Sequence, residues 1–283
     1  MEKSVKSYAK INISLNIKRK REDGYHELDS VMAPIELHDS LLISELKTAE
    51  DNFVTVDDFS NGLVHYNLVG SAIDALSKKY GFKNKYRVYI HKNIPMQAGL
   101  GGGSGNAATM IKYVNDALKL GATNEEMIDI AARLGADIPF FIEGVPARCR
   151  GIGEKVEPIE IKNNYQVLIV KPASGCSTKE VFAISDKKPY PLVDIESVLK
   201  ALKEGDDDLL ASVMGNSLEE SAIQLVPEIQ VIKDKLKELG FKLVLMSGSG
   251  STVFALSTDT VLLKKARKEL EDKYFVELTK IRK

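Results

Sequence analysis

Hydrophobic and polar residues alternate strictly from Lys10 to Ile17. Successive side chains of a β-strand point to opposite faces, so this segment predicts a strand with one apolar and one polar face. The apolar face carries Ile11, Ile13, Leu15 and Ile17, and the polar face carries Lys10, Asn12, Ser14 and Asn16. Taken alone, the pattern favours a polar face turned to solvent, with Lys10 as its single cation.

In other segments, the hydrophobic residues recur with the spacing of either a β-strand or an α-helix. Runs with β-strand character are expected at 31–37, 41–46, 86–91, 166–170, 242–246, 252–256 and 275–281. Apolar residues at helical spacing predict helices at 68–80, from 107 onward, and at 127–134, 227–239 and 261–273. Thr123 with Glu126, and Ser177 with Glu180, have the three-residue spacing of a capping box, which opens a helix.

The order of elements predicts an α+β protein of two domains. In the last third of the chain, strands and helices follow one another as in a sandwich with helices on one face of an antiparallel sheet. Pro158 and the polar residues after it interrupt the pattern, so we place a boundary there. The expected domains are 1–157 and 158–283.

The composition is that of an ordinary globular protein. The chain has 283 residues, 44% of them hydrophobic and 28% charged, with a net charge of −1. A near-neutral charge does not favour binding to nucleic acid, which relies on many contacts of lysine and arginine with phosphates. The basic run Lys18–Arg21 is most simply a solvated hairpin tip. The two cysteines indicate neither a disulfide framework nor a zinc site. No run approaches a membrane span and the first residues lack a signal-peptide core, so we expect a cytoplasmic protein without a membrane partner.

The segment from Pro95 to Ala108 is the most informative motif. Four glycines between positions 99 and 103, with Gly105 beyond, remove Cβ atoms and permit positive φ, so backbone N–H groups can converge on an anion. The helix expected next would add the positive end of its dipole. Neither the Walker loop nor the dinucleotide fingerprint fits, because their lysine and third glycine are missing. The segment therefore predicts a phosphate cradle of another type, with a tight strand-to-helix turn as the alternative.

Three other features carry candidate chemistry. Asp137 lies between the helix that Gly135 ends and the apolar run after Pro139, and we expect that proline to hold the preceding residue in extended geometry. A carboxylate in such a fixed link needs a partner, although a surface turn is the simpler interpretation. The glycine segments at 151–154 and 247–251 are each most simply hairpin turns. No cluster of metal-ligating residues is evident, so we expect no metal held by the protein itself.

Taken together, six motifs resemble one enzyme family across the whole chain and in its order. They are Ala9-Lys-Ile-Asn12, Asp23-Gly-Tyr-His-Glu27, 95–108, Gly135-Ala-Asp-Ile-Pro139, Gly151-Ile-Gly-Glu154 and 247–251. The family comprises the kinases that act on 4-diphosphocytidyl-2-C-methyl-D-erythritol, within the galactokinase, homoserine, mevalonate and phosphomevalonate (GHMP) kinase superfamily. The first two motifs are specific to this family, whereas the glycine loop alone indicates only the superfamily.

The resemblance implies a fold and an activity. The fold would have an S5-like N-terminal ATP-binding domain, a ferredoxin-like C-terminal domain and an active site between them. The activity would be ATP-dependent phosphorylation of the substrate's 2-hydroxyl, giving the 2-phosphate and ADP in non-mevalonate isoprenoid precursor synthesis. Mg²⁺ would arrive on the ATP, and the partners would be these two small molecules. The sequence does not give an oligomeric state.

The resemblance also implies roles for individual residues. Asp137 would be the general base and Lys10 its cationic partner. Asn12, Tyr25, His26 and Phe182 would bind the substrate, with the aromatic groups around the cytosine. The ATP phosphates would be wrapped by Pro95, Met96, Gln97, Ala98, Gly99, Leu100, Gly101, Gly102, Gly103, Ser104 and Gly105. Gln97 and Gly105 stand where the family most often has glycine and serine, and Thr252 where a small residue is usual.

Three alternatives remain at this point. A kinase of the same superfamily acting on mevalonate or homoserine would not need the aromatic residues Tyr25 and Phe182, because neither substrate has a base to stack. An RNA-binding protein with an S5-like domain would need a basic face. A nicotinamide dehydrogenase would need the fingerprint that is missing here.

Overall fold

The computed structural model describes residues 2–46, 50–57 and 67–283. The chain divides into two compact units. Unit 1 comprises Met1–Ala9, Leu37–Pro95 and Gly101–Gly144, and unit 2 comprises Lys10–Glu36, Met96–Leu100 and Val145–Lys283. These units are discontinuous in sequence, and the domain boundary expected after residue 157 stays a prediction.

Two long strands, β1 (Glu2–Lys20) and β2 (His26–Leu46), contribute residues to both units. In unit 1 the second half of β2 pairs antiparallel with β4 (Lys85–His91), and β4 pairs in parallel with β3 (Phe53–Asp57). The two runs expected at 31–37 and 41–46 are thus parts of one strand.

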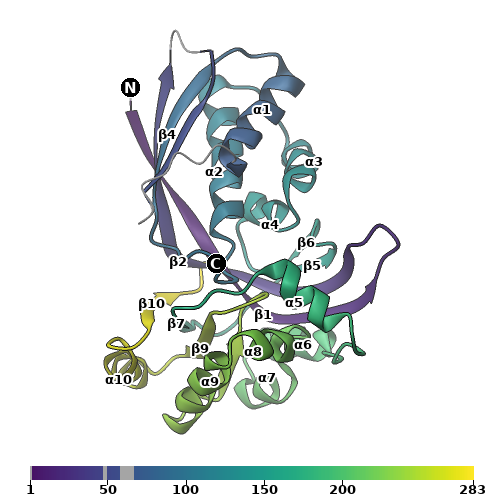
Figure 1. Cartoon of the computed structure of the whole chain (residues 1–283), viewed down its shortest axis with the longest axis vertical. Coiled ribbons are helices and arrows are strands. Elements are labelled where there is room, and N and C mark those ends of the chain that lie inside the picture. Colours follow the sequence, from purple (N-terminus) through teal and green to yellow (C-terminus); the bar gives the residue numbers. More distant parts are fainter. Residues whose placement is uncertain (1, 47–49, 58–66) are drawn as a thin grey trace. The chain divides into compact units, whose positions relative to one another are not determined.

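Four helices complete unit 1. They are α1 (Leu68–Tyr80), α2 (Gly102–Leu118), α3 (Asn124–Leu134) and α4 (Ile138–Glu143). α1 packs on α2, and α4 packs on α2 and α3 (Figure 1). Gly81 ends α1 with a φ of 75°, as expected of a C-terminal glycine, and Thr123 and Glu126 form the predicted capping box.

Two local expectations are wrong. Ile138 is helical rather than extended, because Pro139 lies in the first turn of α4, where its missing N–H costs no hydrogen bond. Ser177 precedes α5 (Thr178–Ser185), but its side chain makes no cap hydrogen bond, so the second capping box does not form.

Unit 2 holds a four-stranded antiparallel sheet in the order β10-β7-β9-β8. The strands are β7 (Gln166–Lys171), β8 (Leu243–Met246), β9 (Val253–Ser257) and β10 (Phe275–Lys280). Helix α9 (Glu228–Glu238) packs on β8 and β9, and α10 (Thr260–Leu270) packs on β7 and β10 (Figure 1). With these two helices as the crossovers, the strand order is that of a ferredoxin-like fold, as predicted. The core between sheet and helices includes Leu168, Val170, Ile232, Leu236 and Ala266.

The remaining elements of unit 2 come before and between these strands. β5 (Ala147–Gly151) pairs with the first half of β2 and, through the expected hairpin, with β6 (Lys155–Pro158). Besides α5, α9 and α10, the helices of this unit are α6 (Ile195–Glu204), α7 (Asp207–Val213) and α8 (Glu219–Leu225).

Candidate functional site

The polar face of β1 is buried, so the expectation of a solvent-exposed face is wrong. Lys10 is 3% exposed and Asn12 1% exposed. Segments distant in the sequence cover this face. The hydroxyl of Ser247 accepts a hydrogen bond from the Asn12 amide at 3.2 Å, and Leu15 exchanges backbone hydrogen bonds with Gly215 and Ser217. A lysine held in such a place needs hydrogen-bond partners, because burial removes its ammonium group from water.

The hydrogen bonds of Lys10 bring it together with two other predicted site residues, Asn12 and Gly99. Lys10 Nζ donates to Asn12 Oδ1 at 2.6 Å and to the Gly99 carbonyl at 3.0 Å. The Gly99 carbonyl also accepts from Ser247 Oγ at 2.9 Å. Gly99 has a φ of +73°, and a Cβ on it would lie 2.0 Å from the Ser247 carbonyl oxygen. This position therefore requires glycine for close packing of backbone on backbone.

The loop 247–251, between β8 and β9, thus supports Lys10 and Gly99. It is held in turn by the buried amide of Asn216, whose Nδ2 donates to the carbonyls of Met246 at 2.9 Å and Gly248 at 2.8 Å. The sequence pattern marks this loop only by its glycines and carries no signal for a role of Ser247 or Asn216. A lone asparagine in a connecting segment carries no pattern that could have revealed it.

The glycine segment enters α2 five residues earlier than the apolar pattern predicts, at Gly102. Gly101 is the N-cap with a φ of 69°; no side chain caps the helix, and its first turn contains no acidic residue. Gln97 also adopts a positive φ of 49°, a backbone conformation that glycine adopts more readily than residues with a Cβ. An uncapped helix start with N–H groups directed outward has the properties of an anion site.

A buried carboxylate in unit 1 holds this helix start and the strand end before it. Asp39 is fully buried. Its Oδ1 accepts from the amides of Asn93 and Ile94, each at 2.9 Å, and its Oδ2 accepts from Asn106 Nδ2 at 3.1 Å and from Lys92. One side chain therefore fixes the end of β4 and the first turns of α2. No local sequence pattern reveals Asp39, because its partners lie 53 to 67 positions away.

Asp137 is the N-cap residue of α4 in unit 1, directly after the end of α3. Its side chain does not cap the helix. Its backbone is fixed on both sides, by the Gly135 amide that closes α3 and by Pro139 in the first turn of α4. The carboxylate is thus presented from a short, rigid link, as expected from the sequence.

The predicted base-binding residues lie in unit 2. The His26 and Phe182 rings stack with centroids 4.4 Å apart, and Tyr25 is 58% exposed. The structure thus brings His26 and Phe182 into direct contact and leaves the Tyr25 ring open to a ligand. An exposed tyrosine ring offers a large, rigid stacking surface.

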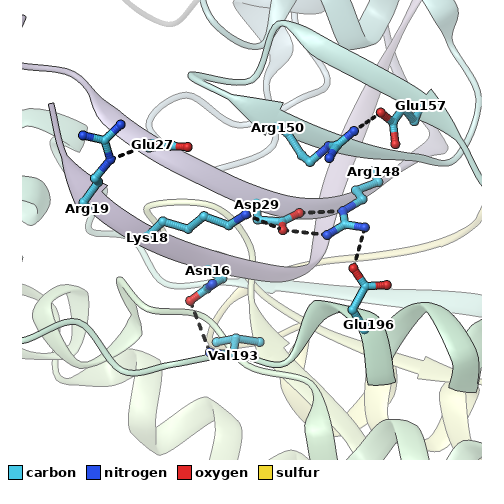
Figure 2. A network of polar contacts seen from close by, with 10 residues as sticks. All are labelled: Asn16, Lys18, Arg19, Glu27, Asp29, Arg148, Arg150, Glu157, Val193 and Glu196. Atoms are coloured by element: carbon cyan, nitrogen blue, oxygen red, sulfur yellow. Dashed lines mark hydrogen bonds and ion pairs between the residues drawn. The ribbon is translucent and has the colours of Figure 1, made fainter.

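The basic run Lys18–Arg21 is neutralised by carboxylates. Lys18 Nζ lies 3.2 Å from Asp29 Oδ2, and Arg19 Nε lies 2.6 Å from Glu27 Oε2. Figure 2 shows both pairs. Lys20 pairs with Asp186 and Arg21 with Asp23. Each cation of the run therefore has an acidic partner.

Asp29, in the same network, is buried and bound by two cations. It accepts a bidentate pair of hydrogen bonds from Arg148 at 2.8 Å each, and Arg148 also contacts Glu196 on α6 (Figure 2). Burial opposes ionisation of Asp29, but Arg148 and Lys18 outweigh it and hold the pKa of that carboxyl below its usual value. The network joins β1, β2, β5 and α6 of unit 2.

Within 2–46, 50–57 and 67–283, no three histidine, cysteine or acidic side chains are grouped so that they could hold a metal ion. None of the helices seen in those ranges has the length and apolar character needed to cross a membrane.

Comparison with known proteins agrees with the motifs. Residues 67–145 match the N-terminal domain of GHMP kinases and residues 198–276 match their C-terminal domain. The 4-diphosphocytidyl-2-C-methyl-D-erythritol kinase of Clostridium beijerinckii is 36% identical over 278 residues, 95% of this chain and 96% of that protein. The chain belongs to the GHMP kinase family. It is a small-molecule kinase.

Two further comparisons agree within this family. The 4-diphosphocytidyl-2-C-methyl-D-erythritol kinase of a Geobacillus species is 37% identical over 258 residues, 89% of this chain and 87% of that protein. A crystal structure of 4-(cytidine 5'-diphospho)-2C-methyl-D-erythritol kinase has a TM-score of 0.81 and 29% identity, and the match covers 100% of both chains. The predicted α+β fold with two GHMP kinase domains is confirmed, and the dehydrogenase alternative is wrong because the chain belongs to a kinase family.

Proposed function

We propose that this GHMP kinase transfers the γ-phosphoryl group of ATP to the 2-hydroxyl of 4-diphosphocytidyl-2-C-methyl-D-erythritol. The products are the 2-phosphate and ADP, in non-mevalonate isoprenoid precursor synthesis. The observation that carries this proposal is the 36% identity to the Clostridium beijerinckii kinase of that name over 95% of the chain. The exposed Tyr25 beside His26 supports it, because mevalonate and homoserine have no base to stack.

The ATP phosphates would lie along the segment Pro95–Gly105. Its second half forms the uncapped start of α2, whose N–H groups and dipole favour an anion. Mg²⁺ on the nucleotide would neutralise charge on the phosphates. No cluster of metal-ligating side chains is found in the described part of the chain. We therefore expect the ion to be bound to ATP, with Ser104 close to the metal-bound nucleotide.

Proton transfer would fall to Asp137. The 2-hydroxyl of the substrate is a tertiary alcohol, which has a very high pKa. A carboxylate must therefore accept its proton as the new P–O bond forms. Asp137 stands on a rigid link suited to this role. Lys10 would be the cationic partner of the base and would offset developing negative charge, and Asn12, which accepts from Lys10 Nζ, would contact the substrate.

The test is a comparison of substrates. We expect ADP release with the cytidylyl substrate and background release with mevalonate or homoserine, measured in parallel at equal enzyme and ATP concentrations. Turnover of mevalonate or homoserine at a comparable kcat/KM would contradict the proposal. A cytoplasmic location and the absence of nucleic-acid and membrane partners stay predictions.

A further inference from the structure

The carboxylate of Glu219 holds the backbone at the end of β8. Glu219 is the first residue of α8, and its side chain is 14% exposed. Its Oε1 accepts a hydrogen bond from the Met246 amide at 3.0 Å. Its Oε2 pairs with the ammonium group of Lys233, a buried lysine of α9. One carboxylate therefore serves two donors, the backbone N–H at the strand end and the lysine.

Asn216 holds the same strand end from its carbonyl side. Its Nδ2 donates to the carbonyls of Met246 and Gly248. Asn216 and Glu219 belong to one connected stretch, because the Glu219 amide donates to the Asn216 carbonyl at 3.0 Å. Both backbone polar groups of Met246 are thus bound by side chains at the start of α8, which fixes the point where the loop 247–251 leaves the sheet.

Gly248 transmits this position to Lys10. Gly248 has a φ of +56°, and a Cβ on it would lie 3.2 Å from Lys10 Nζ and 3.2 Å from Asn12 Oδ1. The same Cβ would lie 3.1 Å from the Gly99 carbonyl oxygen. The loop backbone therefore lies beside the ammonium group and beside two of its hydrogen-bond acceptors. A displacement of the loop would either press on these groups or leave a gap next to them.

We propose that Glu219 is a positioning residue for Lys10, and that it acts through the backbone of Met246 and Gly248. The inference rests on the proposed function for the role of Lys10 as cationic partner of the base. A charge that stabilises a transition state acts best when it is already in place, because the interaction weakens with distance and reorientation costs free energy. Lys233 has a separate task, since it compensates a carboxylate that is mostly removed from water.

Position and stability can be told apart by two substitutions. In Glu219→Gln the amide has one acceptor oxygen for two donors, and Lys233 takes it because a charge-assisted hydrogen bond is the stronger. The NH₂ group then faces the Met246 N–H, so we expect kcat to fall about fivefold or more, with a smaller change in either KM. Lys233→Met keeps the Glu219–Met246 hydrogen bond and should retain at least about half of the wild-type kcat, although it unfolds at a lower urea concentration. Equal loss of kcat in the two variants would overturn the positioning role.

A combined variant and a double-mutant cycle complete the kinetic test. Adding Lys233→Met to Glu219→Gln frees the glutamine oxygen for the Met246 N–H, so kcat should recover to within about twofold of the Lys233→Met value. In the Lys10→Met background, Glu219→Gln should lower kcat by less than about twofold, because the group it positions is gone. Glu220→Gln, at the exposed neighbouring position, is the matched control and should match the wild type. Failure of the rescue, or a full loss in the absence of Lys10, would overturn the inference.

Hydrogen exchange tests the contact without any substrate. In the ligand-free enzyme, NMR should show the Met246 amide exchanging about tenfold or more faster in Glu219→Gln than in the wild type, and close to the wild-type rate in Lys233→Met. An unchanged rate in Glu219→Gln would overturn the role of Glu219. If the wild type did not phosphorylate the cytidylyl substrate, the proposed function would be wrong and the action on Lys10 with it. The exchange result would still decide whether Glu219 holds the loop.

Discussion

The Nζ atom of Lys10 donates a hydrogen bond to the carbonyl oxygen of Gly99, 3.0 Å away. Ser247 Oγ donates to the same oxygen, so one carbonyl joins β1, the glycine segment and the loop between β8 and β9. Lys10 thus supplies both a buried positive charge and a mechanical link to the glycine segment. Two substitutions can separate these contributions.

Lys10→Met keeps most of the side-chain length and removes the charge, so we expect kcat to fall by a factor on the order of 10² or more, as for loss of a transition-state charge partner. Ser247→Ala removes the second donor to Gly99 but keeps the ammonium, and its kcat should fall less than about tenfold. Steady-state kinetics with both substrates varied would measure this. If the two variants lost activity equally, Lys10 would act only by holding the loop.

Asp137→Asn should lower kcat by a factor on the order of 10² to 10⁴, because an amide cannot accept the hydroxyl proton. Binding of ATP, followed by calorimetry or a fluorescent nucleotide, should change little. Glu143→Gln at the other end of α4 is the matched control and should remain close to wild type. Retention of more than about half of the wild-type turnover by Asp137→Asn would exclude it as the base.

Gly105→Ser would restore the residue common in the related kinases, yet we expect it to destabilise this protein by about 1–3 kcal/mol. A Cβ at Gly105 would lie 2.7 Å from the backbone oxygen of Tyr8, which cannot move aside as a flexible side chain can. Gly103→Ala is the control. Its Cβ would meet only Leu68 at 3.9 Å, so higher helix propensity should stabilise it by up to about 1 kcal/mol. Urea unfolding measures both, and an unchanged midpoint for Gly105→Ser would contradict the packing argument.

Tyr25→Ala should lower kcat/KM for the cytidylyl substrate by about 5- to 150-fold, since base–aromatic stacking contributes roughly 1–3 kcal/mol. Tyr25→Phe keeps the ring and should lose far less. The KM for ATP should be unaffected in both variants. Equal impairment of the two substrates by Tyr25→Ala would mean that the cytosine pocket lies elsewhere.

Asp29 should make stability depend on pH in the acidic range. Its pKa is lowered in the folded protein, so its contribution is fully present above the unfolded pKa of about 4 and is lost as the pH falls through the folded value. The free energy of unfolding of Asp29→Asn should therefore differ from that of the wild type most at pH 7, and the difference should shrink between about pH 5 and pH 3.

Urea unfolding at several pH values would measure the Asp29 effect. Glu157→Gln is a suitable control, because Glu157 is about half exposed beside Arg150 (Figure 2). An exposed ion pair contributes little, so this variant should follow the wild type at every pH. A difference between Asp29→Asn and the wild type that stays constant with pH would show that the charge of Asp29 does not stabilise the fold.

Local signals in the sequence determined much of the secondary structure. Gly81 ends α1, the Thr123 capping box opens α3, and the segment 151–154 turns the β5–β6 hairpin, because each depends on residues a few positions apart. The strands and helices of the ferredoxin-like sheet were also predictable from periodicity. Lys10, Asp137 and the glycine segment could be named as candidates because they lie in short motifs that resemble a family.

Tertiary structure alone decided what those candidates touch. The alternating pattern of β1 was correctly assigned to a strand, but whether its polar face meets water depends on segments more than 200 positions away, such as Ser247. The same holds for Asp39 with Asn106 and for His26 with Asp186, which are 67 and 160 positions apart. A single carboxylate has no periodicity, and its role is set by the donors that folding brings to it. Periodicity reports which face of an element is apolar, whereas burial of a polar group and its partner depends on chain segments that only the folded protein brings together.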